Sequence, residues 1–158
     1  IKNELLKYKV KPDYSDGLKL SENIKNLNKQ LEKIKIQDII KDKSKNVIKD
    51  KQIGSFILRH QVLTDFPPKE LRQIIDASKK DIKSGIVVGF ATFEGKVGVA
   101  VGVTNELTKE YDAVTLVKIA SEVLKGKGGG GRKDFAQAGG ANKDKIDEAF
   151  KALCKKIN

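Results

Sequence analysis

The apolar residues divide the chain into a helical first part and a second part in which helix and strand patterns alternate. Apolar residues spaced by four and three positions predict one long helix with a single apolar stripe at Leu20, Ile24, Leu27, Leu31 and Ile34. Ahead of it, Leu5 and Leu6 predict a short helix over Ile1–Val10 that Pro12 ends. The stripe must pack against the second part, a partner helix or a second copy of itself, so dimerisation through it is one of three alternatives.

Residues 38–52 break this pattern. The segment is rich in lysine and its apolar residues keep no clear period, so we predict a connector with a short strand near Val47 and Ile48. A charged run of this kind is more often a solvated surface than a binding site. We therefore predict a helical arm and connector at residues 1–52 and a globular domain at residues 53–158.

The second part alternates between the two element types. Strand patterns occur at 53–63, 86–93, 96–103 and 135–138, and helix patterns at 67–85, at 105–125 with a break near Tyr111-Asp112, and after a capping Asn142. This order predicts the α/β (mixed α+β) class, with a mixed sheet of about four strands packed by helices behind the amphipathic arm.

The strand at 96–103 has one almost bare face. Its valines point one way, while Lys96, Gly98, Ala100 and Gly102 point the other way. A bare face admits either a closely packed helix or a bound chain, and we favour the helix.

Charge adds a class of partner to this picture. The formal charge of +11 and the pI of about 9.6 indicate an anionic partner, either a nucleic acid or an acidic membrane. No apolar run approaches the roughly 20 residues that a bilayer requires, and the chain does not open on a signal-peptide pattern. We therefore expect a cytoplasmic protein. Because the sequence starts at Ile1 and contains no methionine, we also expect an excised domain of a larger parent.

The strongest candidate site is a Gly-rich loop at residues 125–134. Four consecutive glycines stand among four cations, so bare peptide groups and positive charge occur together, as suits a phosphate-contacting loop. A flexible, solvated loop is the alternative. Phe135 is the one aromatic residue beside it, which favours backbone and shape recognition over base stacking. The predicted RNA-binding residues are Lys125, Lys127, Gly128, Gly129, Gly130, Gly131, Arg132, Lys133 and Gln137.

Catalytic patterns are missing from the sequence. The loop lacks the Gly-Lys-Ser/Thr of a P-loop, and its G-x-G-x-x-G match follows a predicted helix instead of a strand. One cysteine, Cys154, and one histidine, His60, cannot form a zinc site or a disulfide within the chain. We expect Cys154 on a buried helix face and a structural His60, with no catalysis, metal or cofactor in this segment.

The glycine segment also carries a family resemblance. GKGGGGRKDFAQAGG at residues 126–140 resembles the C-terminal, DHH-associated module of bacterial-type alanyl-tRNA synthetases, where a pattern close to G-K-G-G-G-R-P-D-x-A-Q-x-G-G lies between a helix and a strand. The matching residues are Gly126, Lys127, Arg132, Asp134, Ala136, Gln137, Gly139 and Gly140. The likeness extends to Leu71-Arg72, Asp76 and Glu94-Gly95-Lys96-Val97. One extra glycine, and Lys133 in place of the usual proline, predict a more mobile and more basic loop.

The resemblance implies a tRNA-binding, non-catalytic domain of a class II ligase that charges tRNA with alanine. It implies a grip on the outer corner of the tRNA, coupling of aminoacylation with editing, and a homodimer held by the arm. The parent enzyme would use ATP, magnesium and zinc in upstream domains. DNA is a further potential partner. Two alternatives stay open: the nucleic-acid clamp of a DHH-type phosphoesterase or single-strand exonuclease, and a purely structural dimerisation arm.

Overall fold

The computed structural model describes residues 17–158, so the predicted helix over Ile1–Val10 lies outside the described residues. The chain divides into two compact units, one up to Asp38 and one from Ile39 onward. Helix α2 (Gly17–Lys41) confirms the long helix predicted from the apolar stripe. Four of the five stripe residues are exposed, and Ile34 leaves 54% of its surface open. Within residues 17–158, no helix combines the length and apolarity needed to cross a membrane.

The second unit is built on a six-stranded mixed sheet with the strand order β1-β2-β3-β4-β6-β5. Its strands are β1 (Asn46–Ile53), β2 (Phe56–Thr64), β3 (Gly85–Phe93), β4 (Lys96–Val103), β5 (Gly129–Arg132) and β6 (Phe135–Gly140). Strands β2 and β3 run parallel, and the other neighbouring pairs run antiparallel. The short helix η1 (Pro68–Glu70) and helix α3 (Leu71–Ile82) form the crossover that a parallel pair requires.

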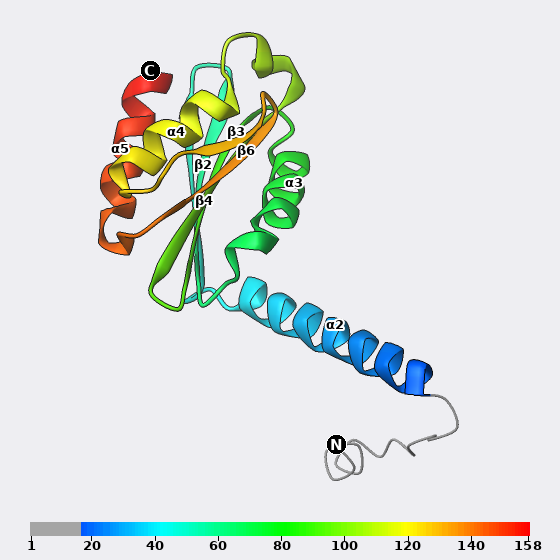
Figure 1. The fold of residues 1–158 in the computed structure, drawn as a ribbon. Helices are drawn as coiled ribbons and strands as arrows, with labels where there is room; N and C mark the ends of the chain where they lie inside the picture. Colours follow the sequence, from blue (N-terminus) through cyan, green and yellow to red (C-terminus); the bar gives the residue numbers. More distant parts are fainter. Residues whose placement is uncertain (1–16) are drawn as a thin grey trace. The chain divides into compact units, whose positions relative to one another are not determined.

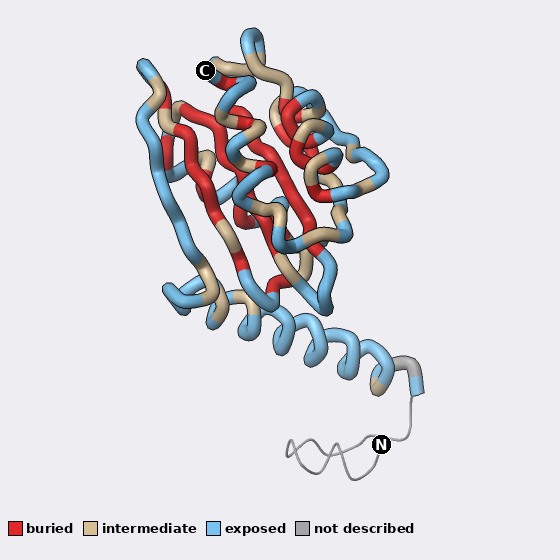
Figure 2. Tube along the Cα trace, turned by 90° about the vertical axis from the view of Figure 1, so that its left-hand side faces the viewer, coloured by how far each residue is buried: buried red, intermediate tan, exposed pale blue. Residues whose placement is uncertain are grey.

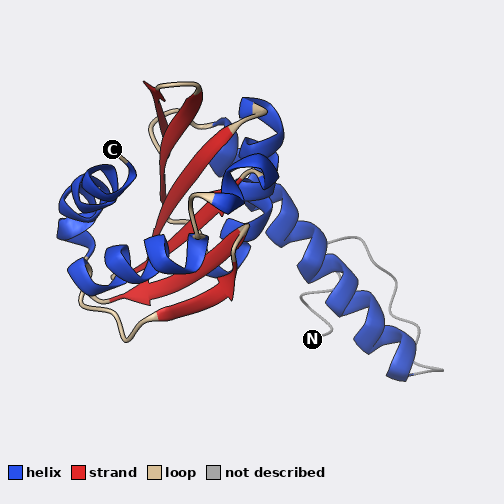
Figure 3. Cartoon of the chain, turned by 90° about the horizontal axis from the view of Figure 1, so that it is seen from above, coloured by secondary structure: helices blue, strands red, loops and turns tan. Residues whose placement is uncertain are grey.

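Helices cover both faces of the sheet. Helix α3 lies on one face, while α4 (Ala113–Val123) and α5 (Ile146–Ile157) lie on the other (Figure 1, Figure 3). A side chain at Gly102 would collide with Ile75 and Lys79 of α3, and one at Gly98 would collide with Pro68. The bare face of β4 is therefore covered by a closely packed helix, which confirms that prediction.

The opposite face of β4 forms the main core. Its valines are almost completely buried and pack with Leu116 and Val117 of α4, with Leu124 just after α4, and with Leu153 of α5. Helix α4 begins at an N-cap, where the Asp112 carboxylate accepts a hydrogen bond from the Val114 amide at 2.9 Å. The segment before it is the short helix η2 (Asn105–Lys109), which confirms the predicted break near Tyr111-Asp112. The mixed α/β class is confirmed as well.

The sheet has six strands, where the sequence predicts a sheet of about four and, in the connector, a short strand near Val47 and Ile48 that β1 confirms. Strand β1 occupies the lysine-rich connector, and the predicted boundary after residue 52 falls inside it, because β1 pairs with β2 along its whole length. As an outer strand it is exposed on nearly all of its length, which Figure 2 shows as a pale blue strand beside the red central strands. Exposure on both faces removes the apolar alternation that would have marked it, and its lysines protect an open sheet edge.

Polar side chains fasten β1 and α3 to β2. The Arg59 guanidinium donates to both carboxylate oxygens of Asp50 at 2.8 Å and to Asp81 at 2.7 Å. Its hydrogen bonds hold the pKa of the Asp50 carboxyl below the ordinary value of 3.8. The stabilisation from this pair is therefore full above pH 3.8 and is lost as the pH falls through the lowered pKa. Ser78 of α3 donates to Gln61, which donates to Asn46.

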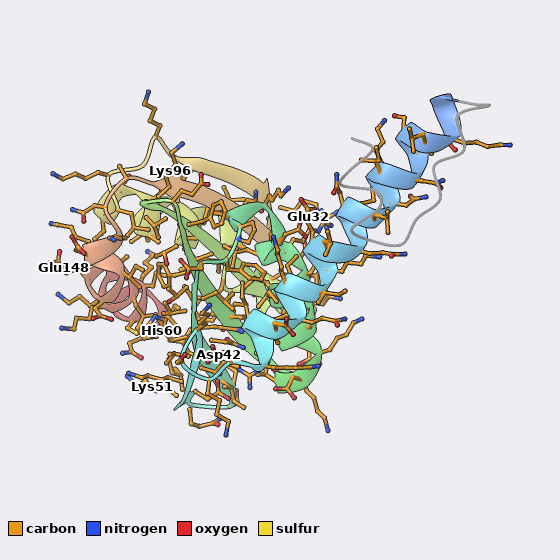
Figure 4. The ribbon with its side chains drawn as sticks, turned by 90° about the horizontal axis from the view of Figure 1, so that it is seen from below. Glu32, Asp42, Lys51, His60, Lys96 and Glu148 are labelled. Carbon is orange, nitrogen blue, oxygen red and sulfur yellow. The ribbon has the colours of Figure 1, made fainter. Side chains whose placement is uncertain are left out.

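His60 lies between the sheet and α5. Figure 4 labels its position on the ribbon. Its ring stacks on Phe150 with 4.0 Å between centroids and meets Phe90 edge to face. The Nε2 atom is buried and has no hydrogen-bond partner among residues 17–158. Burial lowers the pKa of His60, more than the nearby Asp147 raises it. The predicted structural role agrees with this packing. Cys154 is half-buried on α5, and burial raises the pKa of its thiol.

We predict that Arg59→Met lowers the free energy of unfolding by about 1–2 kcal/mol. Without the guanidinium, the carboxylates of Asp50 and Asp81 face a buried apolar side chain. Because both carboxylates are partly exposed, the loss of stability stays below that of breaking a fully buried ion pair. Urea unfolding at pH 7 measures the change in the free energy of unfolding. Lys145→Met, which breaks an exposed pair with Glu148, is the matched control and should cost less than about 0.5 kcal/mol. Equal effects of the two substitutions would contradict the prediction.

We predict that His60 makes the protein less stable as the pH falls from 7.5 to 5.5. The lowered pKa means that the unfolded chain binds the proton first, so stability declines as the pH falls through 6.5, the ordinary value of histidine. His60→Phe keeps the aromatic packing and removes the titrating group. Urea midpoints at the two pH values should differ clearly in the parent and only slightly in the variant. The same pH dependence in both proteins would be evidence against a buried, neutral His60.

Candidate nucleic-acid interface

The predicted Gly-rich loop forms most of a β-hairpin. Strand β5 pairs antiparallel with β6, with Gly129 opposite Ala138, Gly130 opposite Gln137 and Gly131 opposite Ala136. Lys133 and Asp134 form the turn between the two strands, and β6 itself pairs with β4. The loop prediction was therefore wrong in form. A strand made of three glycines and one arginine offers no hydrophobic pattern, so pairing alone defines it.

The end of α4 positions the start of this hairpin. The amide of Gly126 donates to Ser121 O at 2.7 Å and the amide of Lys125 donates to Glu122 O at 3.1 Å, which is the pattern of a Schellman cap. Lys125 has a φ of 55° at the position where glycine is usual. A side chain at Gly126 would collide with Gly139 and Ser121. The chain can therefore enter the hairpin only because residue 126 is a glycine.

The predicted glycines divide into two groups. Side chains at Gly129 and Gly131 would collide with the backbone and side chains of β6, so these two glycines are required by strand pairing. Around Gly128 and Gly130, by contrast, the space is open. Gly130 lies opposite Gln137, and Gly139 follows two residues later on the same side of β6. These three residues, Gly130, Gln137 and Gly139, form an exposed strip that we call the glycine face.

The cations lie at both ends of the hairpin. Lys125 and Lys127 precede β5, while Arg132 and Lys133 stand at the turn, and all four are exposed. An extended chain rises about 3.3 Å per residue, so Lys127 and Lys133 are separated by up to about 20 Å. The predicted site is thus an elongated edge of the sheet with positive charge at each end.

One acidic residue partly neutralises this charge. The Asp134 carboxylate forms an ion pair with Arg132 at 3.3 Å and a longer one with Lys79 at 3.9 Å. The Arg132 side chain is nevertheless 69% exposed. For Lys125, Lys127 and Lys133, no ion pair is found with any of residues 17–158. Most of the local charge therefore remains available to an anionic partner.

Helix α3 adds two cations that the sequence-based prediction did not include. The Arg72 guanidinium lies 5.5 Å from the ring centre of Phe135, and the Lys79 ammonium donates to the Asp134 carbonyl at 3.2 Å. Residues 72 and 79 are seven positions apart, two helical turns, and so they share one side of α3. That spacing was visible in the sequence, but the partner strand was not.

Among residues 17–158, no group of three or more histidine, cysteine, aspartate or glutamate side chains could hold a metal ion. The arrangement offers instead a bare strand edge, hydrogen-bonding groups on Gln137 and exposed cations, which together suit contact with an extended anion.

Comparison with known proteins shows which family the chain is similar to. The model of the DHHA1 domain matches residues 56–158. The alanine–tRNA ligase of Granulibacter bethesdensis is 46% identical over 105 residues, covering 66% of this chain and 12% of that protein. The ligase of Hyphomonas neptunium is 52% identical over 85 residues, covering 54% of this chain and 10% of that protein. This chain therefore spans about a tenth of the length of these relatives.

A solved structure supports the same conclusion. The C-Ala domain of Aquifex aeolicus alanyl-tRNA synthetase is 35% identical, with a TM-score of 0.62, and the match covers 66% of this chain and 94% of that one. The resemblance read from the glycine segment is confirmed. Because the family model covers well over half of the sequence and the fold agrees, this chain belongs to the DHHA1 domain family and has the fold of a C-Ala domain.

Proposed function

We propose that this chain is the tRNA-binding, non-catalytic C-terminal domain of an alanine–tRNA ligase. The observation that carries the proposal is the glycine face, an exposed strip on the β5–β6 hairpin, together with the exposed cations at both ends of that hairpin. The relatives support the choice of partner, because they are alanine–tRNA ligases. The clamp of a DHH-type phosphoesterase has less support, since neither of these relatives is a phosphoesterase.

In this proposal the hairpin contacts the RNA through its backbone. Lys127 and Arg132 lie on either side of the glycine strand and would each neutralise a phosphate, with Lys125 and Lys133 reinforcing them. Gly128 and Gly130 allow close approach, and Gln137 supplies hydrogen bonds to sugar or base groups. Gly129 and Gly131 act indirectly by keeping β5 paired with β6.

The family resemblance supports a proposal for a wider role. We propose that the domain grips the outer corner of the tRNA and so helps aminoacylation and editing to act on the same molecule. ATP, magnesium and zinc would serve the ligase and editing sites of the parent enzyme. DNA would bind through the same cations, more weakly because the corner of a folded tRNA is absent from it.

Self-association is a second proposed role, favoured by the exposed stripe on α2. Four large apolar side chains there lie open on one helix: Ile24, Leu27, Leu31 and Ile34. A second copy of the helix would cover them. The stripe is short, so the dimer should be weak.

We predict that Lys127→Ala combined with Arg132→Ala weakens tRNA binding about 5- to 50-fold. Each lost phosphate contact should also lower the slope of log affinity against log salt by about one. Filter binding of a tRNA transcript at several salt concentrations measures both quantities. Lys155→Ala with Lys156→Ala removes two exposed charges from α5 and is the control. Unchanged affinity and slope in the first variant would defeat the assignment.

We predict that substitutions at two adjacent glycines separate tRNA binding from stability. Gly130→Val should leave stability unchanged or slightly raised, since the position is open and has no positive φ, yet it should weaken tRNA binding by blocking close approach. Gly129→Val should unfold the hairpin, because its side chain would collide with Ala138. Thermal melts and filter binding separate the two effects. Full tRNA affinity in Gly130→Val would show that the strip is not a contact surface.

We predict that Leu27→Glu combined with Leu31→Glu abolishes any self-association of the chain. The stripe residues are exposed, so charge on them should leave the monomer folded while it repels a second helix. Sedimentation velocity at rising concentration gives the measurement. Concentration-dependent sedimentation that persists in this variant would mean that another surface joins the copies.

A further inference from the structure

A polar groove outside the glycine face lies between the C-terminal half of α3 and the segment that follows β4. Its volume is about 460 Å³. Asp76, Lys79, Lys80 and Lys83 line it from α3 and its C-terminal end, and Thr104, Asn105 and Glu106 line it from the segment after β4. Neither the sequence pattern nor the comparisons assign a role to this groove.

Two of the lysines are free to meet an anion. Lys80 and Lys83 are exposed, and neither forms an ion pair with any of residues 17–158. Lys83 also has a φ of 63° just after α3 ends. Glycine would adopt this conformation with less strain, so a lysine here costs stability. Strained backbone conformations of this kind cluster at binding sites and active sites.

The groove continues the proposed RNA surface. Lys79, which lines it, bonds the Asp134 carbonyl at the β5–β6 turn, next to Arg132 and Lys133. The Val103 amide donates to the same Asp134 carbonyl at 2.9 Å, just before the groove residue Thr104. The turn of the hairpin therefore abuts the groove, and a strand that contacts Arg132 or Lys133 can extend into it.

The mixed lining identifies the kind of ligand. Lysines donate to phosphate, but Asp76 and Glu106 would repel a bare phosphate and accept hydrogen bonds from hydroxyl or amino groups. A nucleotide carries both kinds of group, and the groove has the size of a small-molecule site, far too small for a double helix. Single-stranded segments of RNA are the parts whose nucleotides can be splayed into such a site.

We infer that this groove holds one unpaired nucleotide of the bound RNA, with its phosphate on Lys80 and Lys83 and its sugar or base groups toward Glu106 and Asn105. This inference rests on the proposed function, since it requires that the chain binds tRNA. It extends the footprint from the hairpin edge to the end of α3.

The test uses a groove variant that combines Lys80→Ala and Lys83→Ala. Its control is the variant that combines Lys155→Ala and Lys156→Ala. Filter binding of the same tRNA transcript should show a 5- to 10-fold larger loss of affinity in the groove variant, and a salt slope lower by one or two. Hydroxyl-radical footprinting should show one or two backbone positions that lose protection in the groove variant and stay protected in the control. Equal affinity and an unchanged footprint in the two variants would overturn the inference.

A second variant guards against loss of folding. Lys83→Gly relieves the left-handed backbone strain, so thermal stability should be equal or higher while tRNA affinity falls. If Lys83→Gly and the double variant both bind tRNA with full affinity, the groove does not hold a nucleotide. The Lys127→Ala, Arg132→Ala variant separates the two hypotheses. If it weakens binding while the groove variants do not, the groove inference fails alone, and if the parent chain binds no tRNA, both fail.

Discussion

The β5–β6 hairpin depends mainly on main-chain pairing. Strand β5 contributes three glycines and β6 ends in two more, so few side chains anchor the hairpin, chiefly the buried Phe135 and Ala136 of β6. Main-chain hydrogen bonds supply the rest. The turn is tied by the Ala113 amide to Lys133 O and by the Val103 amide to Asp134 O, both within 3.0 Å, and Ser121 donates to Gly139 O. Each of these bonds joins the hairpin to α4 or β4, so the core positions the interface.

This way of holding the hairpin explains where the charges lie. The paired glycines of β5 carry no charge, and two of them, Gly129 and Gly131, have no room for a side chain. The cations lie instead where the strand begins and ends. Lys125 and Lys127 precede the strand, and Arg132 and Lys133 end it. Two further lysines, Lys83 and Lys125, also lie at the end of an element. Each has a positive φ just after a helix, α3 or α4, where glycine would be less strained.

The sequence predicted the elements that carry a strong apolar pattern. The stripe on α2, the apolar run of β3 and the bare face of β4 are such patterns, although the α2 stripe is exposed in the structure. Strand β1 is exposed on both faces, and the sequence predicted only a short strand near Val47 and Ile48 within it. Strand β5 has almost no side chains to show a pattern and was missed. The glycine segment was predicted to be a binding loop, but its form as a hairpin depends on pairing across the sheet. Arg72 and Lys79 became part of it only through α3, whose position no local pattern specifies.

Asp134 shows how a single acid can serve a basic surface. Its carboxylate pairs with Arg132 and Lys79, and its carbonyl accepts from both Lys79 and Val103. An acid among cations lowers the net field, which weakens attraction for polyanions at long range. Its pairs with Arg132 and Lys79 also restrict these two side chains, although Arg132 stays 69% exposed. A cation that is already restricted loses less side-chain entropy when it binds an anion, so Asp134 weakens the long-range field and at the same time orders two of the cations.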